Sequence, residues 1–171
     1  MKRVMTLLTA AAMLAGLLAG CGNGGGETER TPEEWTQLYS AAITDARDEE
    51  TNTAYSILTS SDDDQFDLIL QTLGLTEEDL TAYAISMSLM NVQAYAVAAI
   101  LPAEGKTETV TNALQTYIDN TKASFEFYLP GPFEVASNAR LETLSDGTVL
   151  LVMCEDQDTV FDAISSAITA G

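Results

Sequence analysis

The feature that most restricts the fold is a segment without charge, residues 82–103, in a chain of 171 residues that carries 26 Asp and Glu. Its larger side chains alternate with small or polar ones on both sides of Asn91. A period of two is typical of strands, because successive side chains point to opposite faces of a sheet. The pattern therefore predicts two strands joined near Asn91 in a β-hairpin. The side chains expected on one face of each strand are Tyr83, Ile85, Met87 and Leu89, then Tyr95, Val97, Ala99 and Leu101.

Two alternatives for this segment remain open at the level of sequence. The alanines among residues 92–101 favour a helix, since alanine has the highest helix propensity. A membrane-spanning helix would also account for the lack of charge, but two serines, Asn91 and Gln93 would then place polar groups in the bilayer. The alternation favours the hairpin over both.

Helices and a second hairpin are expected around this segment. Thr31, Pro32 and Glu34 form a capping box that starts an N-terminal helix. The other expected elements are a short helix after Asp62–Asp64 that ends at Gly74, a helical turn after Thr76, a helix over 106–129 ended by Pro130–Pro132, a hairpin over 140–154 and a last helix capped by Asp156 or Asp158. After the N-terminal helices the order is β-β-α-β-β-α. It predicts an α+β fold, with an antiparallel sheet of about four strands and helices packed on one face.

The first residues of the chain have the pattern of a bacterial lipoprotein signal. Lys2 and Arg3 precede an apolar run over 4–19, and Leu18-Ala19-Gly20-Cys21 has the lipobox order of an aliphatic residue, two small residues and a cysteine. This order predicts that the thiol of Cys21 carries a lipid. The partner expected at Cys21 is therefore the cell membrane, with the protein on its extracytoplasmic face.

An ordinary signal peptide or an uncleaved membrane helix are the alternatives for this segment. The apolar run is short for a helix that must cross a bilayer, which needs about 20 residues. The predicted organisation is a signal peptide at 1–20, a lipidated Cys21 with a flexible Gly-rich tether at 21–30, and a single globular domain at 31–171.

The balance of charge excludes several classes of function. The formal net charge is −19 at pH 7, with seven Lys and Arg and no His. Nucleic-acid binding needs clustered basic residues, so no nucleic-acid partner is expected. The lack of His excludes Ser-His-Asp and Cys-His catalysis and His-ligated zinc. Asp62–Asp64 lack the Gly and Glu of an EF-hand loop, and we predict no metal site and no cofactor.

The candidate binding surface is a ledge of aromatic side chains around the turn at Pro130–Pro132. Its members are Phe125, Phe127, Tyr128 and Phe133. They predict either a site for a ligand or partner, or a clamp that fixes the end of the long helix against the sheet. The acidic residues fall on expected loops and polar helix faces, so no catalytic residue is predicted. Cys154 lies in an apolar, strand-like run and is expected to be a buried structural cysteine.

Three stretches resemble a family of small bacterial lipoproteins. They are Ser88–Val92 with the strand that follows, Phe125–Pro130 at the end of the long helix, and Leu150–Val152 in the closing hairpin. The family carries domain of unknown function 4358 and is found mainly in Gram-positive anaerobes. The resemblance spans residues 75–168 together with the lipobox. It implies no particular activity, because the family has none assigned.

These features together predict a surface-anchored extracytoplasmic lipoprotein with a non-enzymatic domain. That domain is expected to bind a small ligand or an envelope protein. One alternative is an accessory subunit of an envelope or transport complex. The other is a carboxylate-dependent hydrolase, which would need two acids held together in a pocket, one of them with a raised pKa.

Overall fold

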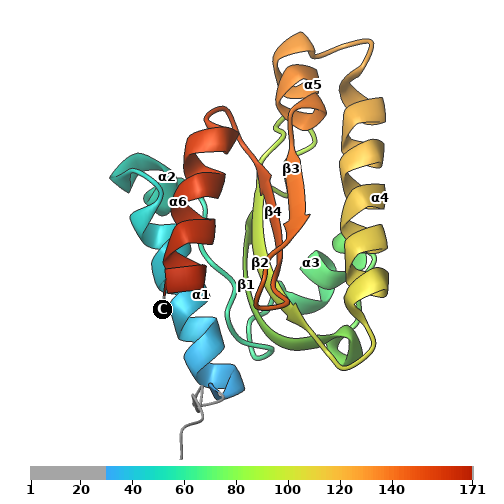
Figure 1. Cartoon of the computed structure of the whole chain (residues 1–171). Helices are drawn as coiled ribbons and strands as arrows, with labels where there is room; N and C mark the ends of the chain where they lie inside the picture. The colour runs from blue at the N-terminus through green and yellow to red at the C-terminus, as the bar shows by residue number, and fades with distance from the viewer. Residues whose placement is uncertain (1–29, 171) are drawn as a thin grey trace, which may run out of the picture.

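A computed structural model describes residues 30–170, in which an antiparallel sheet lies between two layers of helices (Figure 1). The helices are α1 (Pro32–Asp45), α2 (Glu49–Ala54), α3 (Phe66–Leu73), the 3-10 helix η1 (Glu77–Asp79), α4 (Thr107–Phe125), α5 (Pro130–Ser137) and α6 (Gln157–Ala170). The strands are β1 (Leu80–Met87), β2 (Ala96–Pro102), β3 (Arg140–Thr143) and β4 (Val149–Met153). The predicted α+β class with four strands is confirmed. The predicted signal peptide, Cys21 and the tether up to residue 29 lie outside the described residues.

The sheet has the strand order β1-β2-β4-β3, and every neighbouring pair is antiparallel. β1 and β2 form the expected hairpin, with Ser86 opposite Val97, and residues 88–95 connect them. The alternative of a helix over 92–101 is therefore wrong. Leu58 extends the outer edge of β1 through a bridge to Ile85. Among residues 30–170, every helix is too short or too polar to cross a membrane.

Helices cover both faces of the sheet, whereas the sequence predicted helices on one face. α1 and α6 lie on one side and α3 and α4 on the other (Figure 1). The reason is visible in β4, whose five residues are all apolar and all buried. A strand that is apolar on both sides must be covered on both sides. The sheet is consequently the middle of three layers.

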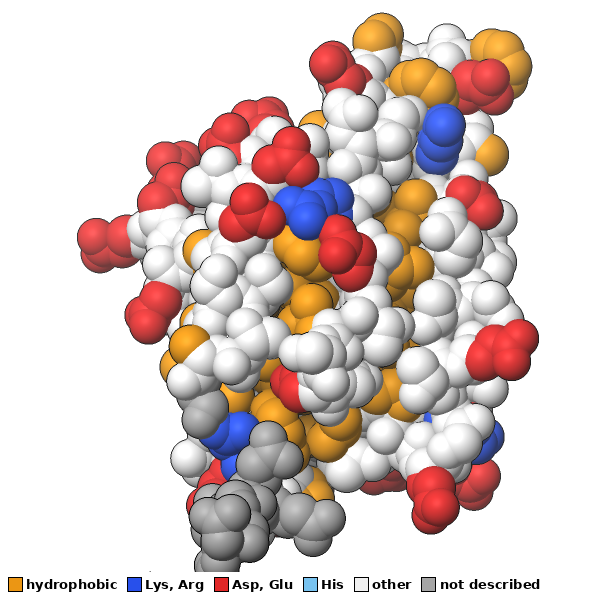
Figure 2. Space-filling model, in the orientation of Figure 1, with side chains coloured by type: hydrophobic (Ala, Val, Ile, Leu, Met, Phe, Trp, Pro, Cys, Tyr) orange, Lys and Arg blue, Asp and Glu red, His pale blue; other side chains and the backbone are white. Residues whose placement is uncertain are grey.

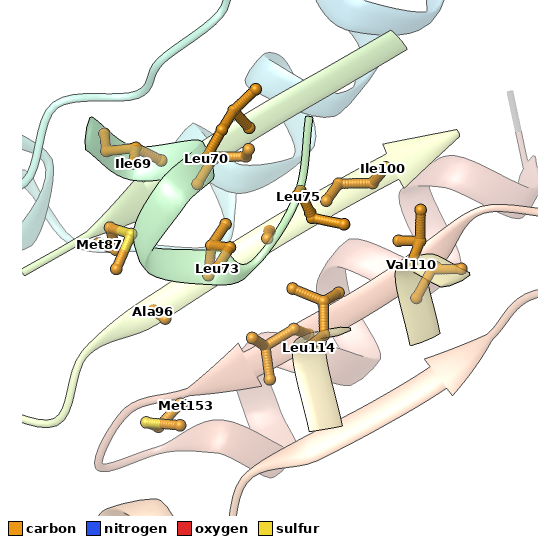
Figure 3. Close-up of a cluster of buried hydrophobic side chains, with 14 of the residues drawn as sticks. Ile69, Leu70, Leu73, Leu75, Met87, Ala96, Ile100, Val110, Leu114 and Met153 are labelled. Atoms are coloured by element: carbon orange, nitrogen blue, oxygen red, sulfur yellow. The ribbon is translucent and has the colours of Figure 1, made fainter. Parts of the chain in front are cut away.

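The face of the sheet toward α3 and α4 is covered by a largely aliphatic core (Figure 3). Leu73 of α3 and Leu114 of α4 lie against Ile100 and its neighbours in the sheet. α3 ends as predicted at Gly74, whose φ of 73° lies in the left-handed region that glycine adopts without strain. This packing holds the β1–β2 hairpin firmly and so positions the loop at its end.

The face toward α1 and α6 combines an apolar core with buried hydrogen bonds. Ile43 of α1 and Ile164 of α6 are fully buried there. The hydroxyl oxygens of Tyr39 and Thr148 lie 2.7 Å apart, and burial raises the pKa of Tyr39. This hydrogen bond ties α1 to the turn between β3 and β4.

Two short helices were not predicted from the sequence. α2 begins after Asp48, whose side chain accepts a hydrogen bond from the N–H of Thr51, at the acidic run where α1 was expected to fade. α5 begins at Pro130, so the predicted stop of α4 also starts a helix. Proline suits that position because the first turn of a helix leaves its N–H groups unpaired. α2, α5, the start of α6 and the β1–β2 loop gather at one end of the sheet (Figure 1).

Candidate functional site

A cleft of about 1030 Å³ opens at this end of the sheet. Its walls come from residues 46–55 at the end of α1 and in α2, residues 92–97 of the β1–β2 loop and β2, α5, and residues 154–160 at the start of α6. Concave sites of this size are typical of small-molecule binding. Four separate segments of the chain therefore meet around one space.

Among residues 30–170, Arg47 is the only basic residue that lines the cleft. Its Nε and Nη2 both donate to Oδ1 of Asn52, at 3.0 and 2.7 Å. Its Nη1 donates to Oγ of Ser86 and to the hydroxyl oxygen of Tyr95, both at 2.7 Å. All three partners are neutral, and no ion pair among the described residues involves Arg47. The guanidinium is thus fixed in position without a carboxylate partner.

An aromatic pair adjoins this guanidinium. The rings of Tyr55 and Tyr95 are stacked, with centroids 3.9 Å apart and planes 11° from parallel. The Tyr55 hydroxyl and the Ser88 hydroxyl both donate to Oε1 of Gln93, at 3.1 and 2.8 Å. Ser86 Oγ donates to the carbonyl of Tyr55 at 3.2 Å. These bonds join the residue after α2, strand β1 and the β1–β2 loop into one network, which fixes the polar groups of the cleft in place.

Four acidic side chains also line the cleft, and all four are exposed to solvent. This acidic rim consists of Asp48, Glu134, Glu155 and Asp156. A hydrogen bond from the backbone N–H of Thr51 lowers the pKa of Asp48. The general acid of a hydrolase needs a shift in the opposite direction, since its carboxyl must stay protonated near neutral pH. The rim therefore places negative charge in the lining of the cleft that also contains Arg47.

Cys154 borders the cleft just after the end of β4 and is half-buried. Burial raises the pKa of its thiol to about 11. At neutral pH the thiol is therefore protonated and a poor nucleophile. The sequence predicted a buried structural cysteine, whereas the side chain is only partly buried and borders the cleft.

The structure divides the four aromatic residues of the predicted ledge. Phe127 and Tyr128, between α4 and α5, are 79% and 83% exposed. Phe125 is only 4% exposed and lines a second cleft of about 250 Å³ formed by α3, α4 and the β1–β2 loop. Phe133 is half-buried, with Nζ of Lys122 5.8 Å from its ring centroid. The ledge is thus reduced to Phe127 and Tyr128, and its role in binding stays a prediction.

Arg47, Tyr55 and Gln93 were not predicted as site residues. Arg47 lies 39 residues before Ser86 and 48 before Tyr95, so its hydrogen-bond partners are distant in sequence. The sequence contained one indication of a role for Arg47. The chain has 26 acidic residues and only seven basic ones, and Arg47 is flanked by acidic residues. A rare basic residue in such surroundings is a candidate for a specific contact.

Within residues 30–170, no group of three or more Cys, Asp or Glu side chains is placed to hold a metal ion. Every buried side-chain nitrogen or oxygen in this range has a hydrogen-bond partner. What the cleft offers a ligand is hydrogen bonding, charge and aromatic contact.

A large part of the chain matches a known protein family. A family model described as Domain of unknown function (DUF4358) matches residues 53–154. The match begins within α2 and ends after β4, so it includes Tyr55, Gln93 and Tyr95, while Arg47 precedes it. No curated protein and no solved structure matches the chain. Because the matched residues make up more than half of its length, the chain belongs to the DUF4358 family.

Proposed function

We propose that this protein is a lipid-anchored extracytoplasmic lipoprotein that binds a small ligand, or a short segment of an envelope protein, without transforming it. The observation that carries this proposal is the cleft, in which Arg47 and the pair Tyr55–Tyr95 are held by neutral hydrogen-bond partners. Polar groups that are oriented before the ligand arrives reduce the entropic cost of binding. Such preorganisation favours recognition of a specific ligand.

The direction in which the cleft faces supports an extracytoplasmic binding role. α1 begins at Pro32, at the end of the sheet opposite the cleft (Figure 1). The predicted lipid at Cys21 would attach to the domain from that end. The cleft would then open away from the membrane, where solutes and envelope proteins reach it.

The surface charge supports the same arrangement. Acidic side chains are spread over the face of the molecule in Figure 2, with few basic ones between them. A chain with a net charge of −19 is repelled by anionic lipids. The domain would therefore stand off the bilayer, held by its lipid alone.

A bulky side chain in the cleft tests the binding role directly. Thr159 is exposed in the first turn of α6 and lines the cleft, so Thr159→Trp fills the space without disturbing the core. We expect fragments that bind the native, detergent-solubilised protein in ligand-observed NMR to lose binding to this variant. Thr169→Trp, exposed on the same helix but outside the cleft, is the matched control and should retain binding. Equal binding by both variants would place the ligand site elsewhere.

The anchor is tested by removal of the predicted lipid acceptor. We expect Cys21→Ala to move the protein from the membrane fraction to the soluble fraction, because the thiol is then missing. Cys154→Ala, which removes the other cysteine of the chain, should leave the protein in the membrane fraction. Unchanged partition of Cys21→Ala would show that no lipid at this residue anchors the chain.

A second function, as an accessory subunit of an envelope complex, is favoured by the exposure of Phe127 and Tyr128. Two adjacent, largely exposed aromatic rings are typical of a contact surface. If they bind a partner, cross-linking on whole cells should capture a stoichiometric complex that the double change of both residues to Ser abolishes. Leu68→Ser, which removes another exposed apolar side chain, is the control. A complex that survives the double change would not use this surface.

A further inference from the structure

We propose that the cleft recognises a zwitterion, with the anionic group of the ligand on Arg47 and its cationic group at the acidic rim. This inference rests on the proposed function of the cleft as a ligand site. The chemical class is a small molecule that carries a carboxylate and an ammonium group close together, such as an amino acid or a short peptide.

The guanidinium of Arg47 supplies the anion-binding half of this site. Arginine has five N–H donors and keeps its charge at every physiological pH. Four hydrogen bonds engage the side chains of Asn52, Ser86 and Tyr95, which leaves one N–H of Nη2 for a ligand. Because these partners are neutral, they orient the positive charge without neutralising it. An incoming carboxylate would therefore form a charge-assisted hydrogen bond, which is stronger than a neutral one.

Two further donors, from Gln93 and Tyr95, line the same cleft. Oε1 of Gln93 accepts from Tyr55 and Ser88, while its amide nitrogen has no protein partner in the described part of the chain. Since every buried polar side-chain atom there is paired, this nitrogen is accessible to solvent. Burial raises the pKa of Tyr95, whose hydroxyl accepts from Arg47 and keeps its own proton to donate. Arg47 and Gln93 thus each keep an N–H that no acceptor in the described part of the chain uses.

The acidic rim supplies the other half of the site. A ligand with only negative charge is repelled by four exposed carboxylates and by the net charge of −19. A ligand with only positive charge is attracted to the rim but leaves Arg47 without a carboxylate partner. A zwitterion meets both requirements and has no net charge to be repelled. The tyrosine pair and Val92 add aromatic and apolar contact for the rest of the molecule.

Three probes of nearly equal shape test this preference on the native protein alone. L-phenylalanine is the zwitterion, N-acetyl-L-phenylalanine the anion, and L-phenylalanine amide, at mildly acidic pH, the cation. We expect the zwitterion to bind about tenfold more tightly than either relative in calorimetry at fixed ionic strength, the effect of one charged contact. Equal affinities, or tighter binding of the anion or the cation, would overturn the inference. No variant is needed for this comparison, so it does not depend on any substitution folding.

A charge-removing variant then assigns the preference to Arg47. Arg47→Gln should reduce the affinity for L-phenylalanine about tenfold and should not weaken the binding of the amide, which has no carboxylate to lose a contact. Lys122→Gln, which removes a basic residue outside the cleft, should change neither. An undiminished preference for the zwitterion in Arg47→Gln would overturn the assignment. If neutral fragments are excluded by Thr159→Trp while the three probes show no ranking, the ligand class is wrong and the binding function stands.

Discussion

The two faces of the sheet are built from the same strands but differ in chemistry. Toward α3 and α4, an apolar cluster forms the core, and a buried carboxylate, that of Asp79, lies at its edge. Toward α1 and α6, the apolar core is accompanied by two hydrogen-bonded groups, Tyr39 with Thr148 and Arg47 with Ser86 and Tyr95. The first group lies at the start of β4 and the second near its end.

The difference shows why the cleft is on one face and at one end. A buried polar group costs free energy unless it has a partner, so a core closed on all sides tolerates few of them. A network that keeps unused donors must therefore reach solvent. On the face toward α1 and α6, the network reaches solvent where α2, α5 and the β1–β2 loop meet. The face toward α3 and α4 serves mainly to stabilise the sheet.

The largest expected effect on stability tests whether both faces of the sheet are packed against helices. Leu150 and Leu151 are adjacent on β4, both fully buried, and belong to opposite faces. We expect Leu150→Ala and Leu151→Ala each to reduce the free energy of unfolding by about 2–5 kcal/mol, because each removes a packed side chain and leaves a cavity. Urea unfolding at neutral pH measures this. A loss below about 0.5 kcal/mol for either would mean that its face is not covered.

The next effect concerns a charged contact at the edge of the α4 side. Asp79 is 5% exposed and accepts from Nζ of Lys106 at 2.9 Å and from N and Oγ1 of Thr76 at 2.9 and 2.8 Å. Asp79→Asn should lower the free energy of unfolding by about 1–3 kcal/mol. The reason is that a neutral amide oxygen accepts the hydrogen bonds of Lys106 and Thr76 more weakly than the buried carboxylate does. Asp64→Asn, an exposed acid, is the control.

This contribution should depend on pH. The hydrogen bond from Lys106 is the main cause that lowers the pKa of Asp79 in the folded protein. A lowered pKa means that the stabilisation is complete above the unfolded pKa, about 3.9, and is lost as pH falls through the folded value. The difference between native protein and Asp79→Asn should therefore shrink when unfolding is measured at pH below that range. A difference independent of pH would contradict this assignment.

A smaller effect is expected on the opposite face, where the contact is neutral. Tyr39→Phe removes the hydrogen bond to Thr148 but keeps the ring, and Thr148 retains its bond to Asp146. We expect a loss of about 0.5–1.5 kcal/mol. Because burial raises the pKa of Tyr39, its contribution is complete below about pH 10 and is lost as pH rises further. Thermal unfolding of both proteins at neutral and alkaline pH would show this, and a constant difference would argue against it.

The smallest effect is expected for the two side chains that belong to neither face. Phe127→Ser and Tyr128→Ser should each change the free energy of unfolding by less than about 0.5 kcal/mol, because their rings are largely exposed. Chemical unfolding monitored by circular dichroism is sufficient. A larger loss would mean that these rings clamp the end of α4 instead of forming a surface for a partner.

Much of the local structure could be predicted from particular residues. The capping box of Thr31 and Glu34 starts α1, and Gly74 ends α3, because both patterns act within one helical turn. The alternation of larger with small or polar side chains after Ala82 predicted the hairpin of β1 and β2. The short helices α2 and α5 were missed, since a helix of 6 or 8 residues carries too few turns for a periodic pattern.

The candidate site was out of reach of such patterns. The clustered aromatics that marked the ledge turned out to be split between the core and the surface, with Phe125 buried and Phe127 exposed. The cleft instead depends on Arg47, whose partners Ser86 and Tyr95 come from β1 and from the residue before β2. Single residues without a motif reveal their role only when packing brings them together.

The sequence by itself determined the strands, most helix ends, the acidic character and the lipobox, because each depends on neighbours within a few residues or on composition. The tertiary structure alone decided that helices cover both faces of the sheet and that the segment beginning at Pro130 forms α5. It also decided that four segments distant in sequence enclose a cleft lined by Arg47. The physical reason is that burial of apolar surface is not directional. It drives the layers together, and where they do not close completely, the remaining polar groups form the site.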